Sequence, residues 1–164
     1  MPVPRLLPAL LLVAPGPVAA QDAPRENRPP LVELQQPSCV RPGARPRACA
    51  RVTDDHGVAQ VRALFRAVGA ESFHSTVMLF DGTRYCAWLP APLPGTGAVE
   101  VYVEGLDDEY ELSRGPAAQL EVDADCAVEA DPAPAPPTSV RPTTPGQPSL
   151  PDGFDPESMR ADAG

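Results

Sequence analysis

The chain has 164 residues and a net charge of −9, with hydrophobic residues making up 43% of the sequence. An acidic chain repels phosphate backbones, so this charge argues against nucleic acid as a partner. Eight of the 24 prolines lie in residues 1–30 and nine in residues 128–164, which leaves seven for the stretch between. A folded domain is therefore expected only over about residues 31–127.

Residues 1–20 follow the plan of a secretory signal peptide. Arg5 supplies a positive charge, residues 6–14 form a short apolar run, and residues 18–20 offer small side chains before a cleavage point. The alternative is a membrane anchor, which needs about 20 apolar residues, and prolines within and just after this run interrupt it. We therefore expect no transmembrane span, export to the periplasm or the outside of the cell, and a polar linker over residues 21–30.

The chain contains four cysteines, Cys39, Cys49, Cys86 and Cys126. In a small exported protein, four cysteines predict two disulfides. The alternative is a zinc site, which needs close ligand pairs such as C-x-x-C, and these spacings contain none. We therefore expect disulfides and no cofactor.

Short apolar runs separated by turn residues follow the linker at intervals of about ten residues, which indicates an all-β domain. Turn chemistry is present at Asp54–Gly57, Asp81–Gly82, Pro94–Gly95 and Gly115–Pro116. Within the runs every second residue is apolar, as in Ala48, Ala50 and Val52, which places each such set on one face of a strand. Strands are predicted near residues 31–35, 46–53, 58–67, 73–80, 83–89, 98–106 and 117–123.

Residues 128–164 combine nine prolines with few large apolar residues. Such a composition buries too little surface to offset the entropy of ordering, so a disordered, acidic, proline-rich tail is expected. The spacing of Pro134 and Pro137 fits a PxxP peptide motif formally, which leaves open whether the tail is a ligand or a plain spacer.

The run from residue 50 to residue 108 resembles bacterial fibronectin type III-like and immunoglobulin-like modules. Those modules carry V-x-D-D at a strand end, then G-V-x-x-V, an aromatic–Arg pair, G-x-Y-x-A-x-[IL]-P-A, and an apolar strand before an acidic turn. The corresponding residues are Val52–Asp55, Gly57, Val58, Val61, Phe65, Arg66, Gly82, Tyr85, Ala87, Leu89–Ala91 and Val99–Asp108, with two residues rather than one between Gly82 and Tyr85. The resemblance implies an antiparallel β-sandwich of about seven strands, stapled here by cysteines, and leaves function open because such folds host many binding roles.

The resembled fold also bears on the disulfide pairing. Strand parity places Cys49 and Cys86 on outward faces, and in that fold their strands are antiparallel neighbours within one sheet. Two outward cysteines on adjacent strands can meet across the sheet. We therefore predict the pairs Cys49–Cys86 and Cys39–Cys126.

The same parity defines a candidate contact face. Its outward residues are Arg62, Leu64 and Arg66 on one strand and Glu100, Tyr102 and Glu104 on another. Antiparallel pairing would set Leu64 beside Tyr102, between two Arg–Glu pairs. This ladder either only stabilises the sheet or forms an apolar contact patch with a charged rim. Trp88, outward and near Arg47, is a further candidate, either as a platform for sugars or as a partner for that cation.

Acidic turns offer a weak calcium candidate in Asp54, Asp55, Asp107 and Asp108, because these loops share one end of the resembled fold. Simple turn chemistry explains the same residues. The histidines have no orienting acid, and the sequence lacks nucleophile, zinc-protease and phosphate-loop motifs. We therefore expect a non-catalytic binding module for an unknown protein or envelope component. The alternatives are a structural spacer and a carbohydrate-binding module.

Overall fold

The computed structural model describes residues 27–127 and 136–162, so the predicted signal peptide and most of the linker lie outside the described residues. Within them the chain is almost entirely β-structure, as predicted, with one turn of 3-10 helix, η1 (Pro156–Ser158). None of the helices in the described ranges is long and apolar enough to cross a membrane. The strands are β1 (Leu31–Gln35), β2 (Cys39–Val40), β3 (Arg47–Thr53), β4 (Val58–Ala67), β5 (His74–Val77), β6 (Leu79–Phe80), β7 (Tyr85–Trp88), β8 (Ala98–Asp107), β9 (Leu112–Arg114), β10 (Ala118–Val122), β11 (Thr138–Pro142) and β12 (Met159–Ala161).

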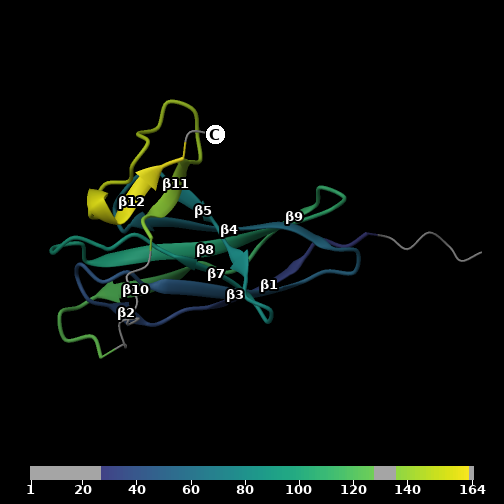
Figure 1. Cartoon of the computed structure of the whole chain (residues 1–164), viewed down its shortest axis with the longest axis horizontal. Coiled ribbons are helices and arrows are strands. Elements are labelled where there is room, and N and C mark those ends of the chain that lie inside the picture. The colour runs from purple at the N-terminus through teal and green to yellow at the C-terminus, as the bar shows by residue number, and fades with distance from the viewer. Residues whose placement is uncertain (1–26, 128–135, 163–164) are drawn as a thin grey trace, which may run out of the picture.

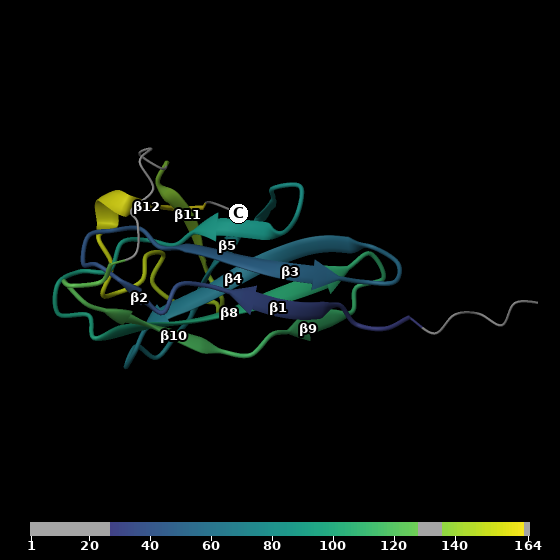
Figure 2. The ribbon, with the colours of Figure 1, turned by 90° about the horizontal axis from the view of Figure 1, so that it is seen from below.

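The strands form two sheets with one apolar core between them (Figure 1). One sheet has the order β1-β3-β7-β6. The other runs β12-β11-β5-β4-β8-β10-β2, with β9 added beside β8. The view from below shows β1 and β3 lying over β4 and β8 (Figure 2). Most pairs are antiparallel, as expected, but β10 pairs with β2 and β11 with β12 in parallel.

Each of the seven predicted strands is present, with one division that the sequence did not indicate. The predicted strand over residues 73–80 is split at Met78, so that β5 belongs to the larger sheet and β6 to the smaller one. The two short strands β2 and β9 were not predicted, because two or three residues carry no readable alternation.

The alternating apolar residues form the core, as their parity predicts. Ala50, Phe65 and Val101 are fully buried, and the cluster continues through both sheets. A buried side chain of the size of Phe65 contributes roughly 1.5–3 kcal/mol through the surface that it removes from water. The two sheets are therefore held together mainly by the inward-facing set that the period of two identifies.

Both predicted disulfides are confirmed. Cys49 and Cys86 lie directly opposite each other on β3 and β7, with 4.1 Å between their Cα atoms. Cys39 and Cys126 are joined across a sequence separation of 87, with 5.9 Å between their Cα atoms. The second bond ties β2 to the segment that follows β10.

The prediction of a disordered tail over residues 128–164 is wrong for residues 136–162. Residues 128–135 and 163–164 lie outside the described residues, and with them Pro134 of the PxxP spacing. From residue 136 the chain forms β11, then η1 and β12, and β11 pairs with β5 at the edge of the larger sheet. The folded unit therefore extends well past residue 127.

A few large side chains explain why this proline-rich segment is ordered. Val140, Phe154 and Met159 are 0%, 3% and 6% exposed, and they join the same core as the earlier strands. The Phe154 ring meets the Phe65 ring edge-on, with 5.4 Å between centroids. Pro142 is the last residue of β11, a position where a proline removes little pairing. Proline content alone is thus a poor guide when the remaining residues reach a core.

Candidate binding groove on the larger sheet

The candidate contact face has the predicted register. Arg62 lies opposite Glu104, Leu64 opposite Tyr102 and Arg66 opposite Glu100, on β4 and β8. Two of these pairs are ion pairs, with N–O distances of 3.0 Å for Arg62–Glu104 and 2.8 Å for Arg66–Glu100. The ladder therefore exists and stabilises the sheet, by about 0.2–1 kcal/mol per pair.

The apolar centre of that face is covered, which corrects the idea of an exposed contact patch there. Leu64 is 4% and Tyr102 7% exposed. The Phe73 ring packs edge-on against Tyr102 at 4.9 Å, and the Arg114 guanidinium lies 4.4 Å from the centre of the Tyr102 ring. Burial also raises the pKa of the Tyr102 hydroxyl. Leu64 and Tyr102 are thus part of the packing of the domain.

Trp88 pairs with a cation, which was one of the two roles predicted for it; the other was a platform for sugars. The Arg47 guanidinium lies over the indole, 5.8 Å from the ring centroid. The Trp88 backbone carbonyl accepts a hydrogen bond from the Thr138 hydroxyl at 2.8 Å, which fastens the start of β11 to the end of β7. Trp88 therefore stands where the two regions of the chain meet.

The acidic turns lie at one end of the domain, since the Asp108 N–H donates to the Gly57 carbonyl. Their carboxylates are occupied in different ways. Asp54 accepts from the backbone N–H groups of His56 and Gly57. Asp107 is fully buried and accepts from the Asn27 side chain and from two backbone N–H groups of its own turn. Asp54 and Asp107 thus act in turn chemistry, the simpler of the two predicted roles.

His74 has a structural position. Its side chain is buried, and its Nε2–H donates to the Pro148 carbonyl at 2.8 Å. Gln147 donates from its amide nitrogen to Nδ1 of the same ring at 3.0 Å and to the Phe73 carbonyl at 2.7 Å. His74 therefore holds the loop between β11 and η1 against β5.

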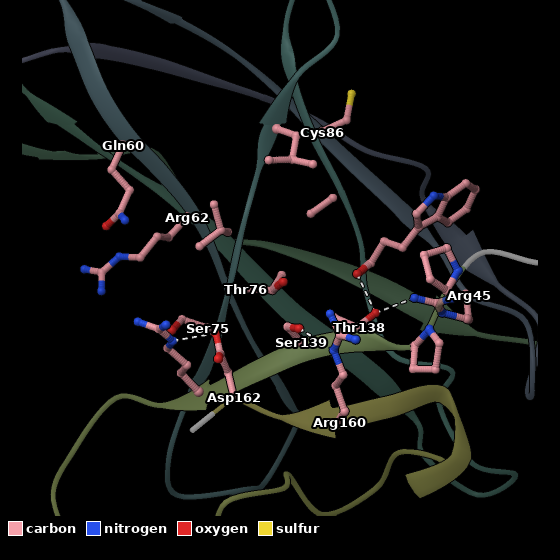
Figure 3. A pocket seen from close by; sticks show the side chains of 17 residues that line it. Arg45, Gln60, Arg62, Ser75, Thr76, Cys86, Thr138, Ser139, Arg160 and Asp162 are labelled. Atoms are coloured by element: carbon pink, nitrogen blue, oxygen red, sulfur yellow. Dashed lines mark hydrogen bonds and ion pairs between the residues drawn. The ribbon is translucent and has the colours of Figure 1, made fainter. Parts of the chain in front are cut away.

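A groove of about 410 Å³ opens where the chain passes from β5 in the larger sheet to β6 in the smaller one (Figure 3). Arg62 and Gln60 of β4 lie on one side of it, and Arg45 and Thr138 on the other, with Ser75 and Thr76 between them. Val77, Leu79 and Trp88 add apolar surface. The groove was not predicted, because seven of its 17 lining residues come from the segment that was expected to be disordered.

Four arginines and one aspartate line this groove in a chain whose net charge is −9. Each arginine is oriented by a contact within the chain. Arg160 donates from Nε to the Ser139 hydroxyl at 2.7 Å, and Arg141 donates from Nε to Asp162 at 2.8 Å. Arg45 donates to the Thr138 hydroxyl, and burial lowers the pKa of its guanidinium. The groove is thus locally cationic on an acidic protein.

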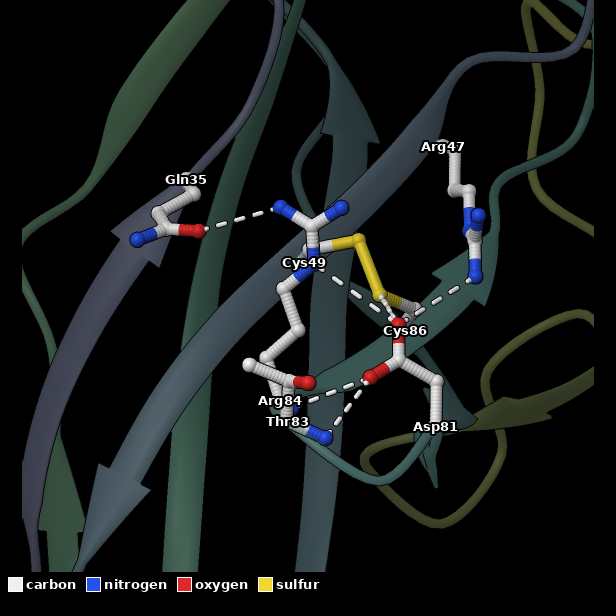
Figure 4. Close-up of a disulfide and its surroundings, with 7 residues drawn as sticks. All are labelled: Gln35, Arg47, Cys49, Asp81, Thr83, Arg84 and Cys86. Carbon is white, nitrogen blue, oxygen red and sulfur yellow. Dashed lines mark hydrogen bonds and ion pairs between the residues drawn. A yellow bond between two sulfur atoms is a disulfide. The ribbon is translucent and has the colours of Figure 1, made fainter.

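The Cys49–Cys86 disulfide stands at one wall of the groove, where Cys86 is a lining residue. Asp81 organises its surroundings (Figure 4). The carboxylate accepts from the backbone N–H groups of Thr83 and Arg84 and lies 3.6 Å from Nη2 of Arg47. Backbone hydrogen bonds from Arg84 and Thr83 hold the pKa of Asp81 below its usual value. These side chains explain why two outward-facing cysteines are only 5% and 7% exposed.

The two ring nitrogens of His74 bond the Pro148 carbonyl and the Gln147 amide, so both take part in holding the loop. No protein-family model and no curated protein sequence matches this chain.

Proposed function

We propose that the protein is an exported, non-catalytic binding module with a fibronectin type III-like or immunoglobulin-like β-sandwich fold. Its ligand would be a protein or another component of the cell envelope. The two packed sheets and the sequence pattern of residues 50–108 support the fold. The two disulfides support an oxidising compartment, as does the signal-like start of the sequence.

One observation carries the binding role: the arginine-lined groove at the junction of the two sheets. Its rim includes apolar side chains whose exposure to water does not stabilise the folded monomer. Leu79 is 73% and Val77 42% exposed, beside a surface rich in hydrogen-bond donors. Apolar residues next to oriented polar groups are the usual make-up of a binding site.

A structural spacer is the second candidate, and the burial of Leu64 and Tyr102 favours it. The face that the sequence offered for contact is used internally, as it would be in a domain that only sets a distance. A spacer would leave the groove without a ligand. Position-specific crosslinking distinguishes the two functions.

The test places a photo-crosslinking amino acid at Leu79 in the full chain, which is then irradiated in the native envelope fraction. Leu31, 62% exposed and on β1 at the far edge of the smaller sheet, is the matched control position. The binding role predicts a discrete adduct from position 79 that is missing from position 31. No adduct, or the same adducts from both positions, would contradict it and favour the spacer.

A further inference from the structure

We propose that the groove binds an extended polypeptide segment carrying two carboxylate side chains about four residues apart, with an apolar residue midway between them. This inference rests on the proposed binding role and specifies its ligand. It follows from the placement of the arginines across the larger sheet.

The placement is given by the strand register. Arg62 on β4 lies opposite Val77 on β5, and Ser139 on β11 lies opposite Arg160 on β12. β11 joins these two pairs, because Arg141 lies opposite Ser75 and the antiparallel register then brings Ser139 beside Val77. One row across β4, β5, β11 and β12 therefore consists of Arg62, Val77, Ser139 and Arg160.

The spacing of this row sets the spacing of the ligand. Neighbouring strands lie about 4.8 Å apart, so the strands of Arg62 and Arg160 are separated by about 14 Å. An extended peptide advances about 3.3 Å per residue, so about four residues cover this distance. In such a peptide, side chains at positions i, i+2 and i+4 point the same way. Two carboxylates at the ends would meet the arginines, and an apolar side chain between them would meet Val77.

Arginine favours a carboxylate partner in this setting. Its planar guanidinium carries five N–H donors in a fork that matches a carboxylate, and one hydrogen bond within the chain orients that fork. Arg160 has this arrangement through the Ser139 hydroxyl, whereas Arg62 is oriented by its ion pair with Glu104, which engages Nη2. Because the protein as a whole is acidic, the local cluster would also direct an acidic segment to this place.

The segment that leads into β11 forms part of the wall at one end of the groove. Pro136 and Pro137 line it beside Trp88, and the Thr138 hydroxyl bonds both the Trp88 carbonyl and Arg45. Val77, an apolar residue between arginines, matches a peptide side chain better than it matches a phosphate or a sugar ring.

The test uses the fluorescence of Trp88, the one tryptophan of the sequence, which lines the groove. The full oxidised chain is titrated with the capped peptide Glu-Ser-Leu-Ser-Glu. We expect a saturable change below about 1 mM peptide that weakens as salt is added. The neutral peptide Gln-Ser-Leu-Ser-Gln and the regrouped peptide Glu-Glu-Leu-Ser-Ser should each bind at least about tenfold more weakly.

Variants connect the signal to the groove. Arg141→Glu/Arg160→Glu should weaken binding of the acidic peptide at least about tenfold, and Arg160→Gln several-fold. The control Arg28→Glu/Arg51→Glu makes the same change of net charge outside the groove and should bind within about twofold of the wild type. Circular dichroism and thermal melting confirm that each variant is folded. Equal binding of the neutral peptide, or of the doubly reversed groove variant, would overturn the proposal.

Inorganic phosphate and polygalacturonate serve as competing anions. Saturable binding of either without binding of the acidic peptide would overturn the peptide as ligand. This failure differs from a failure of the binding role. If no probe binds while the Leu79 adduct persists and Arg141→Glu/Arg160→Glu removes it, the ligand class is wrong and the binding role stands. If the adduct does not depend on the groove arginines, the binding role at this groove fails as well.

Discussion

Two regions of the chain contribute side chains to one core but have different sequence patterns. The first region is residues 31–122 and the second is residues 136–162. The first region alternates apolar and polar residues along strands. Most of its inward side chains are small or β-branched. The second has one apolar core residue in β11, Val140, and adds Phe154 from a loop and Met159 from the short strand β12. Order in the second region therefore depends on a few anchors, whereas in the first it is distributed over many contacts.

The comparison also bears on function, because the groove needs both regions. β4, β5, β6 and β7 give one wall, and residues 136–141, Arg160 and Asp162 complete it. A loosened second region would remove two of the four arginines while the first region remained folded. The following predictions test whether the two regions respond differently to substitution.

The largest effect should come from Cys39→Ser/Cys126→Ser, which opens the longer disulfide loop, with a sequence separation of 87. The chain-entropy model gives a ceiling of about 4–5 kcal/mol for a loop of this length. We expect the whole domain to unfold at a lower denaturant concentration, with both regions lost together. Urea titration by circular dichroism measures this. A midpoint equal to that of the oxidised wild type would contradict a stabilising role for the bond.

Phe154→Ala should come next, with a cost of about 3–5 kcal/mol, because it empties a buried site against Phe65. The loss should be concentrated in the second region, which has few other anchors. Phe80→Ala removes the same side chain at a position that is 59% exposed and should change stability by less than about 0.5 kcal/mol. Thermal melting of both variants compares the two. Similar melting temperatures for them would contradict the anchoring role of Phe154.

These residues also show how far the sequence could predict the structure. Alternation and the resemblance identified the seven strands, the inward set and both disulfides, because a sustained alternation of apolar and polar residues is typical of a β-strand with one buried face. Phe154 and Met159 were overlooked because isolated apolar residues among prolines have no period. The burial of Leu64 and Tyr102 was also not predicted. Phe73 and Arg114, which pack on Tyr102, come from a loop and from a strand too short to predict. The groove was missed because part of its wall comes from the second region, which Phe154 and Met159 anchor to the core.

Gln147→Ala should have a smaller effect, about 1–3 kcal/mol, since it removes hydrogen bonds rather than a core side chain. The Gln147 amide donates to His74 on β5 and to the carbonyl of Phe73, the residue before β5, and it accepts from the backbone N–H groups of Thr143 and Thr144. We expect faster amide exchange in β11 and β12 and little change in β4 and β8. The neighbouring exposed substitution Thr144→Ala, which keeps its backbone bond, is the control. Equal acceleration in both regions would refute a local role.

The smallest effect concerns pH and falls on the first region. Burial works to raise the pKa of Asp107, but hydrogen bonds from Asn27 and from the N–H groups of Glu111 and Glu109 outweigh it and hold the pKa below its usual value. A carboxyl with a lowered folded-state pKa stabilises the fold above the unfolded pKa of about 3.9 and loses that stabilisation as the pH falls through the folded value. Melting temperatures between pH 7 and pH 3 should therefore drop, and less steeply in Asp107→Asn. A slope shared by the wild type and Asp107→Asn would count against Asp107.

Hydrogen exchange followed by mass spectrometry tests most directly whether residues 136–162 are part of the folded domain. The informative amides are those of Asp155 and Asp162, which donate to the carbonyls of Ala91 and Val140 at 2.8 and 2.9 Å. The structure predicts that peptides covering β11 and β12 exchange orders of magnitude more slowly than an unstructured chain, in the range of the other edge strands. Exchange of these peptides at the rate of an unstructured peptide would contradict the account, and with it the groove.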